Sequence, residues 1–94
     1  MVVMEDTAKI GYMPVRVWGC PTTAMWTYRL GPEKAKRMLF TGDKVTGTEA
    51  AEMGLVLKAV PANELDAEVE RLAERMATVP INQLMMQKLS LIHI

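Results

Sequence analysis

Few side chains in this 94-residue sequence have both the type and the spacing for acid–base or nucleophilic chemistry. Glu5 and Asp6 are neighbouring carboxylates, a pairing that can serve as acid and base. Side chains of neighbouring residues usually point apart, so we interpret this pair as part of an exposed turn. Cys20, the single cysteine, excludes an internal disulfide and a multi-cysteine metal site, and we interpret it as a buried structural thiol. The single histidine, His93, stands alone near the chain end, so no metal site is expected.

Three other side chains, within residues 10–21, could contact a ligand, and each also has an ordinary structural interpretation. Tyr12 could donate a proton, although a tyrosine on an apolar strand more often packs its ring and satisfies its hydroxyl. Arg16 could bind a phosphate or a carboxylate, or lie on the surface. Trp18 could line a pocket or pack in the core. The residue types alone leave these alternatives open.

The elements that must position these residues are signalled most strongly between residues 29 and 58. Gly31 and Pro32 predict that one helix, from Thr22, ends at Leu30 and that another begins directly after it. Thr41-Gly42-Asp43 is predicted to end the second helix. Its apolar residues recur at helical spacing and predict a buried stripe of Ala35, Met38 and Leu39.

A second set of signals follows. Thr46 and Glu49 are three residues apart and predict a capping box that opens a short helix, Gly47–Met53. After Gly54, the apolar run Leu55–Leu57 has the length of a strand.

The two ends of the sequence carry simpler patterns. Met1–Met4 is an apolar run that predicts a buried strand, cut at its beginning. Asn63 is predicted to cap a helix that Pro80 ends. One amphipathic face of this helix carries Leu65, Val69, Leu72, Ala73 and Met76, and a further helical stripe holds Ile81, Leu84 and Met85.

Composition narrows the class of protein. Half of the residues are hydrophobic, which is typical of a globular chain, and the length allows one small domain. The formal net charge of zero gives no electrostatic case for nucleic acid. No apolar run reaches the roughly eighteen residues that a membrane span requires, and a lone thiol fits a reducing compartment. We therefore expect a cytoplasmic protein that neither spans a membrane nor binds nucleic acid.

The segment LGPEKAKRMLFTGDKVTGTEAAEMGLV closely resembles the part of the crotonase (enoyl-CoA hydratase/isomerase) family that follows the active site. The matching features are Leu30-Gly31, Thr41-Gly42, Glu49-Ala50 and Gly54-Leu55-Val56, in this order and spacing. The resemblance covers about residues 1–88. It implies an α/β parent with the crotonase/ClpP-like spiral fold, of which this chain is a mainly α-helical C-terminal portion with a few short strands.

The resemblance also implies a division of the chain. Residues 1–21 correspond to the end of the spiral core with its active-site loop, and residues 22–60 to the helices and short strand that close the core. Residues 61–89 correspond to the C-terminal helical part. The tail, residues 90–94, does not resemble the family.

In this register the family's acid–base glutamate falls on Pro14, which has no titratable group. The implied acyl-CoA-binding residues are Pro14, Val17 and Trp18, and none of the residues present is an implied catalytic residue. The family's oxyanion-hole donors and its other glutamate are expected to precede Met1. No resident cofactor or metal is implied, because the substrate itself carries coenzyme A. A homo-oligomer, a trimer or hexamer, is implied.

Three interpretations follow. The first is a C-terminal fragment of a family member that acts on acyl-CoA thioesters and is inactive on its own. The second is a catalytically dead helical module, derived from this family, that serves oligomerisation or interaction. The third is an unrelated small helical binding domain whose match is accidental.

Overall fold

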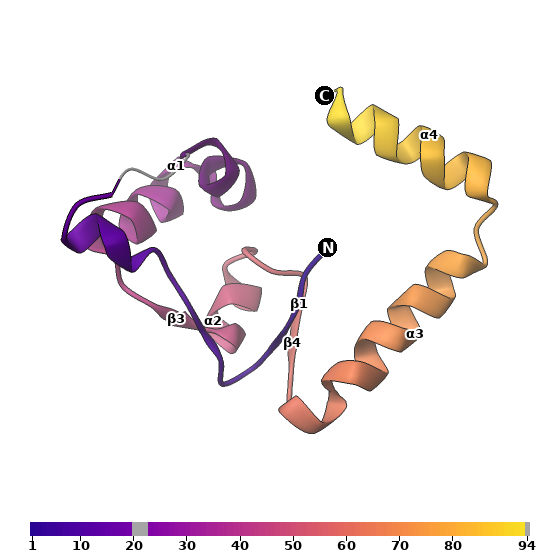
Figure 1. The fold of residues 1–94 in the computed structure, drawn as a ribbon, viewed down its shortest axis with the longest axis horizontal. Coiled ribbons are helices and arrows are strands. Elements are labelled where there is room, and N and C mark those ends of the chain that lie inside the picture. Colours follow the sequence, from indigo (N-terminus) through magenta and orange to yellow (C-terminus); the bar gives the residue numbers. More distant parts are fainter. Residues whose placement is uncertain (20–22, 94) are drawn as a thin grey trace.

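The computed structural model describes residues 1–19 and 23–93, which form a small lobe followed by a helical arm (Figure 1). The lobe contains the short strands and two of the helices, and the arm contains the last two helices. In chain order the elements are β1 (Val3–Glu5), β2 (Lys9–Ile10), the 3-10 helix η1 (Met13–Arg16), α1 (Thr23–Thr41), β3 (Val45–Thr46), α2 (Gly47–Glu52), β4 (Lys58–Val60), the 3-10 helix η2 (Ala62–Glu64), α3 (Leu65–Ala77) and α4 (Ile81–Ile92).

The beginning of the chain pairs with residues far along the sequence. β1 runs parallel to β4, with Val3 opposite Lys58, and β2 runs antiparallel to β3, with Ile10 opposite Val45. Residues 3–10 are thus held along the segment that surrounds α2. This arrangement fixes where the following residues, 11–19, leave the lobe.

The predicted strand at Leu55–Leu57 is wrong, because β4 begins only at Lys58. The backbone N–H groups of Leu55 and Val56 both donate to the carbonyl oxygen of Ala50, at 2.9 and 3.3 Å, and so complete the end of α2. Both side chains are buried in the core. Leu55 and Val56 are therefore apolar because they are buried in a turn, whereas Leu57 is exposed and its N–H donates to the Val2 carbonyl oxygen at 2.9 Å, next to β1.

The predicted break between two helices at Gly31 is confirmed. Gly31 has φ of 76° and ψ of 167°, which is not helical, and Pro32 follows at the start of the second half of α1. A positive φ is readily available to glycine, whereas other residues rarely adopt it. The two halves of α1 can therefore meet the core at different angles.

The predicted capping box is also confirmed. The backbone N–H of Glu49 donates to Thr46 Oγ1, and the Glu49 carboxylate accepts from the backbone N–H of Thr46, both at 3.3 Å. These two bonds satisfy groups that the first turn of α2 would leave unpaired.

The core lies between α1, α2 and the loop before β4. Met38 is fully buried at its centre, and the predicted burial of Ala35 is confirmed, whereas Leu39 is half-buried at the edge. The buried cluster comprises Trp26, Leu30, Ala35, Met38, Val45, Ala50, Leu55 and Val56.

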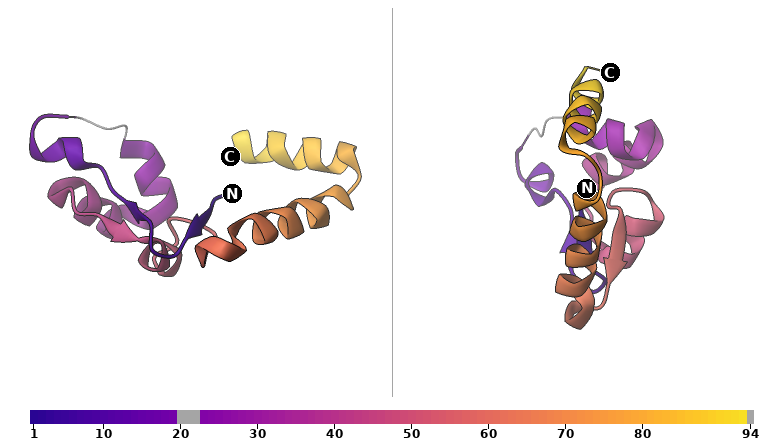
Figure 2. Two further views of the ribbon diagram at one scale, coloured as in Figure 1. Left: turned by 60° about the horizontal axis from the view of Figure 1, so that its bottom comes forward. Right: turned by 90° about the vertical axis from the view of Figure 1, so that its right-hand side faces the viewer.

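The arm contributes no fully buried side chain among the described residues. α3 packs beside β1, and an apolar hollow of about 330 Å³ lies between them. Figure 2 shows α3 leading away from the lobe and α4 turning back toward it. The apolar face predicted on α3 is present but largely open to solvent, as are most apolar side chains of α4.

Two details at the ends of the arm's helices differ from the predictions. Asn63 does not cap α3; it lies within η2, and the N-cap residue of α3 is Glu64, without a side-chain capping bond. α4 runs to Ile92, so residues 90–92 continue a helix rather than forming a separate tail. No helix within the described ranges is long and apolar enough to cross a lipid bilayer.

Candidate functional site

Residues 14–19 form a tight loop, here called the Pro14–Gly19 loop, that leaves the lobe after β2. η1 begins this loop with Pro14 in its first turn. The backbone N–H of Val17 donates to the Pro14 carbonyl oxygen at 3.1 Å. Gly19 then packs on Pro14 so closely that a Cβ on Gly19 would lie 2.9 Å from the Pro14 Cβ. The loop is therefore folded back on its own proline.

This folding projects two large apolar side chains outward. Val17 is 85% exposed and Trp18 is 87% exposed, which is unusual for residues of this size. The three residues predicted to contact the acyl-CoA, Pro14, Val17 and Trp18, therefore lie in this one loop. Their chemistry is apolar contact, because none of them carries a group that exchanges protons near neutral pH.

An apolar cleft of about 350 Å³ lies where this loop leaves the lobe. Ile10 and Gly11, which lead into the loop, form part of its wall. Among the described lining residues only Arg29 is charged, and its Nη1 donates to the Leu55 carbonyl oxygen at 3.0 Å. The lining residues are Val2, Ile10, Gly11, Met25, Trp26, Arg29, Leu55 and Val56.

Sequence reasoning did not find this cleft. Its walls come from β2, the first half of α1 and the turn before β4, which are distant in the chain. The available signal was the placement of Ile10-Gly11 directly before the predicted ligand-contact residues, together with the apolar run at Leu55. The cleft is shaped for apolar groups rather than for ionic ones.

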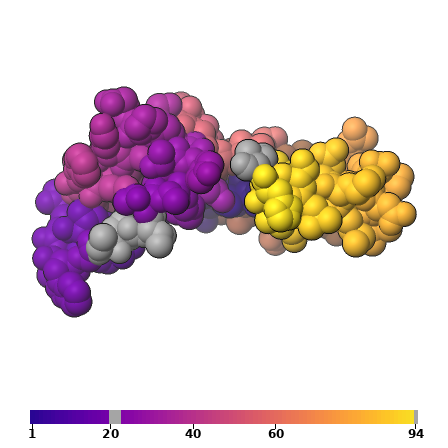
Figure 3. All heavy atoms as spheres, turned by 90° about the horizontal axis from the view of Figure 1, so that it is seen from above, coloured from indigo at the N-terminus to yellow at the C-terminus, as the bar shows by residue number. Residues whose placement is uncertain are grey.

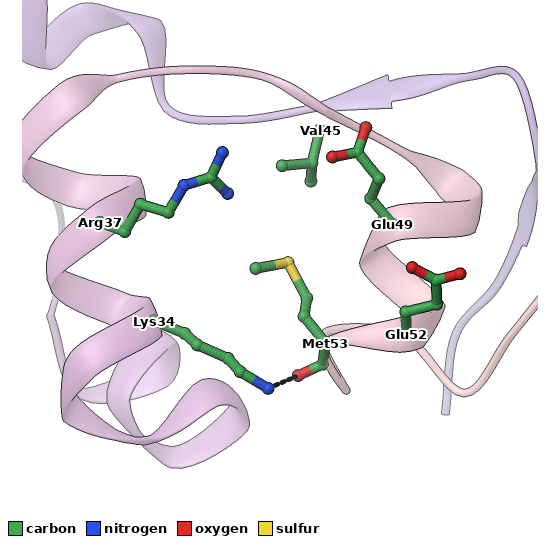
Figure 4. A pocket seen from close by; sticks show the side chains of 6 residues that line it. All are labelled: Lys34, Arg37, Val45, Glu49, Glu52 and Met53. Carbon is green, nitrogen blue, oxygen red and sulfur yellow. Dashed lines mark hydrogen bonds between the residues drawn. The ribbon is translucent and has the colours of Figure 1, made fainter.

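A second pocket, of about 270 Å³, carries opposite charges on facing helices (Figure 4). Lys34 and Arg37 project from α1, and Glu49 and Glu52 lie on α2. Lys34 Nζ donates to the Met53 carbonyl oxygen at 3.5 Å, and the Glu49 carboxylate is already engaged in the capping box. The charges balance one another across an open space, which is ordinary for two solvated helix faces.

The other residues with potential for chemistry do not converge on the loop. The predicted exposed turn at Glu5 and Asp6 is only partly right: Asp6 lies in a turn, but Glu5 is the last residue of β1 and both are half-buried. The Glu5 carboxylate accepts a hydrogen bond from Thr7 Oγ1 at 2.9 Å. The predicted packing of the Tyr12 ring is confirmed, because it is half-buried against the core, although Tyr12 precedes η1 rather than lying in a strand. His93 ends α4, and Cys20 lies outside the described residues. Within ranges 1–19 and 23–93 no group of three potential ligands is placed to hold a metal ion.

Comparison with known proteins relates this arrangement to a family. A sequence model of the family described as enoyl-CoA hydratase/isomerase matches residues 1–93. The chain belongs to the enoyl-CoA hydratase/isomerase family. The accidental-match interpretation is therefore wrong, and the resemblance at residues 30–56 reflects true membership.

Individual members of this family are also similar to the chain in sequence. A protein of Dictyostelium discoideum, "Probable enoyl-CoA hydratase, mitochondrial", is 37% identical over 74 residues, covering 79% of this chain and 25% of that protein. A mouse protein, "Enoyl-CoA hydratase domain-containing protein 3, mitochondrial", is 39% identical over 61 residues, covering 64% of this chain and 20% of that protein. The chain thus spans about a quarter or less of these two relatives.

The fold of this family member is also that of solved structures. A crystal structure of an enoyl-CoA hydratase from Mycobacterium smegmatis superposes with a TM-score of 0.88 at 53% identity, covering 94% of this chain and 30% of the other. The predicted fold class, a mainly helical portion of the crotonase fold with a few short strands, is confirmed. The family match also extends through residues 90–93, which were predicted not to resemble the family.

Proposed function

We propose that this chain is the C-terminal portion of an enoyl-CoA hydratase/isomerase-family protein that acts on acyl-CoA thioesters. In this proposal the Pro14–Gly19 loop contacts the acyl part of the substrate. The observation that carries it is the exposure of Val17 and Trp18 on a loop that is bent back onto Pro14 and begins three residues after Gly11, a lining residue of the apolar cleft. An acyl chain offers the apolar surface that such side chains can cover.

We also propose that these residues alone do not catalyse hydration. Adding water across an enoyl thioester requires a group that transfers a proton to or from carbon, and Pro14 occupies the register of the family's glutamate without a titratable group. Asp43 is close to the loop, but its carboxylate faces Arg16 at 3.7 Å. The oxyanion donors and the other glutamate are assigned to the part of the family fold that precedes the matched region.

The proposed partners are the acyl-CoA thioester and further copies of the same protein. Coenzyme A arrives with the substrate, so the proposal includes no resident cofactor. The arm extends to one side of the lobe (Figure 3), and most of the large apolar side chains of α4 are exposed, which supports assembly as a trimer or hexamer. A cytoplasmic location remains a prediction, and the Dictyostelium and mouse relatives are named as mitochondrial proteins.

A second candidate function is a catalytically inactive module for oligomerisation or interaction. The specific observation in its favour is the open apolar surface of α4, where Met85, Leu89 and Ile92 are all more than half exposed and line one hollow. Contiguous exposed apolar surface of this kind typically marks a contact with another protein. In this alternative the arm functions without any thioester on the loop.

Native mass spectrometry of the chain with crotonyl-CoA separates the two candidates. The first candidate function predicts trimer-sized species that carry the thioester. It also predicts that free coenzyme A is retained more weakly, because free coenzyme A has no acyl group to contact the loop. Self-association with no bound thioester at any concentration would favour the interaction module. A Trp18→Ala variant provides the matched control, since it removes a loop contact without altering the arm.

A further inference from the structure

The Thr41–Asp43 turn contacts the start of the Pro14–Gly19 loop and is held by its own hydrogen bonds. Thr41 Oγ1 donates to the Arg37 carbonyl oxygen at 2.6 Å and accepts from the backbone N–H of Asp43 at 3.1 Å. The backbone N–H of Gly42 donates to the carbonyl oxygen of Met38, the fully buried centre of the core. The turn is therefore a rigid extension of α1.

Arg16 spans this turn with both parts of its side chain. A Cβ on Gly42 would lie 3.0 Å from Arg16 Cγ and 3.6 Å from Cδ, so the aliphatic stem rests on the bare glycine. Gly42 also has φ of +68°, a conformation that other residues rarely adopt. At the far end, Arg16 Nη2 lies 3.7 Å from Asp43 Oδ1.

The same turn supports the chain just before η1. A Cβ on Gly11 would lie 2.7 Å from the carbonyl oxygen of Asp43, so the two backbones touch there. Gly11 and Arg16 thus fix both ends of the segment that leads into Val17 and Trp18. Arg16 is the last residue of η1, and the next residue, Val17, donates the hydrogen bond that closes the loop on Pro14.

We infer that Arg16 is a positioning residue for the Pro14–Gly19 loop, acting through Gly42 and Asp43 rather than by contact with a ligand. In this inference the Arg16 guanidinium pairs with the Asp43 carboxylate of the same chain. That the loop so positioned contacts an acyl chain rests on the proposed function, whereas the positioning itself does not.

Arg16 holds the Pro14–Gly19 loop in place both through packing of its stem and through its charge. The Arg16 and Asp43 side chains are 58% and 51% exposed, so their ion pair in solvent is weak on its own. The stem on Gly42 adds apolar contact that a lysine retains in part and an alanine loses. We therefore expect Arg16→Lys to preserve the loop better than Arg16→Ala.

Amide hydrogen exchange of Val17, followed by NMR in the ligand-free 94-residue chain, tests this inference. Arg16→Ala is expected to speed Val17 exchange by about fivefold, the upper range for loss of one exposed ion pair, while amides within α1 keep their protection. Asp43→Asn, which retains the backbone bond to Thr41, should act in the same direction, and Arg16→Lys should have a smaller effect. Lys36→Ala is the matched control, because it removes a comparable surface ion pair with Glu33 (3.8 Å) away from the loop.

An unchanged Val17 exchange rate in both Arg16→Ala and Asp43→Asn, with α1 intact, would overturn the inference. If Arg16→Ala unfolds α1, the Asp43→Asn and Arg16→Lys variants decide between the outcomes. A crotonyl-CoA titration keeps this test separate from the proposed function. If Val17 exchanges faster in the Arg16 and Asp43 variants but none of the proteins binds the thioester, only the proposed function is contradicted. If all variants bind the thioester equally and Val17 exchange is unchanged, only the positioning role is contradicted.

Discussion

Lys58 Nζ on β4 lies 2.9 Å from Glu68 Oε1 on α3, and this bond joins the lobe to the arm. Arg71, one turn further along α3, donates to the other carboxylate oxygen of Glu68. The hydrogen bond from Lys58 is the main cause that lowers the pKa of Glu68, with the charge of Arg71 adding to it and partial desolvation opposing it. The three side chains form the polar connection at the base of α3.

Acid should weaken this connection. Because the pKa of Glu68 in the folded chain is below the ordinary value of 4.5, its ionised form stabilises the fold above that value. The stabilisation is lost as the pH falls below 4.5 through the lowered pKa. We expect the Tm of Glu68→Gln, measured by circular dichroism, to fall less steeply over this range than that of the unmodified chain.

Glu33→Gln is the control for this acid effect, since Glu33 pairs with Lys36 on an exposed face of α1. Its pH profile should follow that of the unmodified chain. A profile for Glu68→Gln that is as steep as the unmodified one would show that acid acts elsewhere.

The capping box makes a measurable contribution to stability. Thr46→Ala removes the oxygen that accepts the N–H of Glu49, so we expect the free energy of unfolding to fall by about 1 kcal/mol. Urea denaturation measures the change. Thr27→Ala, at an exposed position inside α1, should cost nothing comparable. Equal losses in the two variants would contradict the role of the cap.

Shortening a side chain at the centre of the core should lower the stability of the fold far more than shortening one in the arm. Met38→Ala empties a fully buried site and is expected to lower the free energy of unfolding by about 2–5 kcal/mol. Met86→Ala, at an exposed position on α4, should change it by less than about 0.5 kcal/mol. Comparable effects in urea denaturation would mean that the Met86 side of α4, outside the hollow of Met85, Leu89 and Ile92, is also covered in solution.

Self-association should depend on one face of α4. Met85, Leu89 and Ile92 line an apolar hollow there with the stem of Lys88. Leu89→Glu places a charge in it and should shift the chain toward monomer in sedimentation velocity, because burying an unpaired charge is costly. Gln87→Glu adds the same charge on another face of the helix and should leave association unchanged. Association that resists Leu89→Glu would place the interface elsewhere.

Restoring the family's carboxylate tests the register of Pro14. In the full-length protein that we propose, Pro14→Glu should raise the rate of crotonyl-CoA hydration, by a factor that for a positioned acid–base group is about 10² or more. Pro14→Gln has nearly the same shape without the acid and should not raise it. If both variants fold and hydrate at the same rate, the carboxylate site lies at another residue.

The local features of this fold could be predicted because neighbouring residues determine them. Gly31-Pro32 breaks α1 and the Thr46–Glu49 box opens α2 within a few residues of chain. The strand at Leu55 was mispredicted because the N–H groups of Leu55 and Val56 donate to the Ala50 carbonyl oxygen at the end of α2, a local bonding pattern that an apolar run does not reveal.

Features of the site that depend on contacts between distant segments could not be predicted from the sequence. The pairing of β1 with β4 brings Val3 to Lys58, and no local pattern encodes that register. The apolar cleft beside Ile10 and the partner of Arg16, Asp43, arise only once these segments meet. The loop residues themselves were identified through the family register, which carries information from many sequences that composition and periodicity lack.

The most direct test of the central claim is photo-crosslinking with a CoA thioester whose acyl chain carries a diazirine, followed by peptide mapping. We predict that the label attaches to Val17 or Trp18 and that excess crotonyl-CoA competes it away, whereas excess free coenzyme A competes poorly. Labelling confined to α3 and α4, or labelling of the loop that crotonyl-CoA does not reduce, would contradict the assignment of this loop to the acyl group.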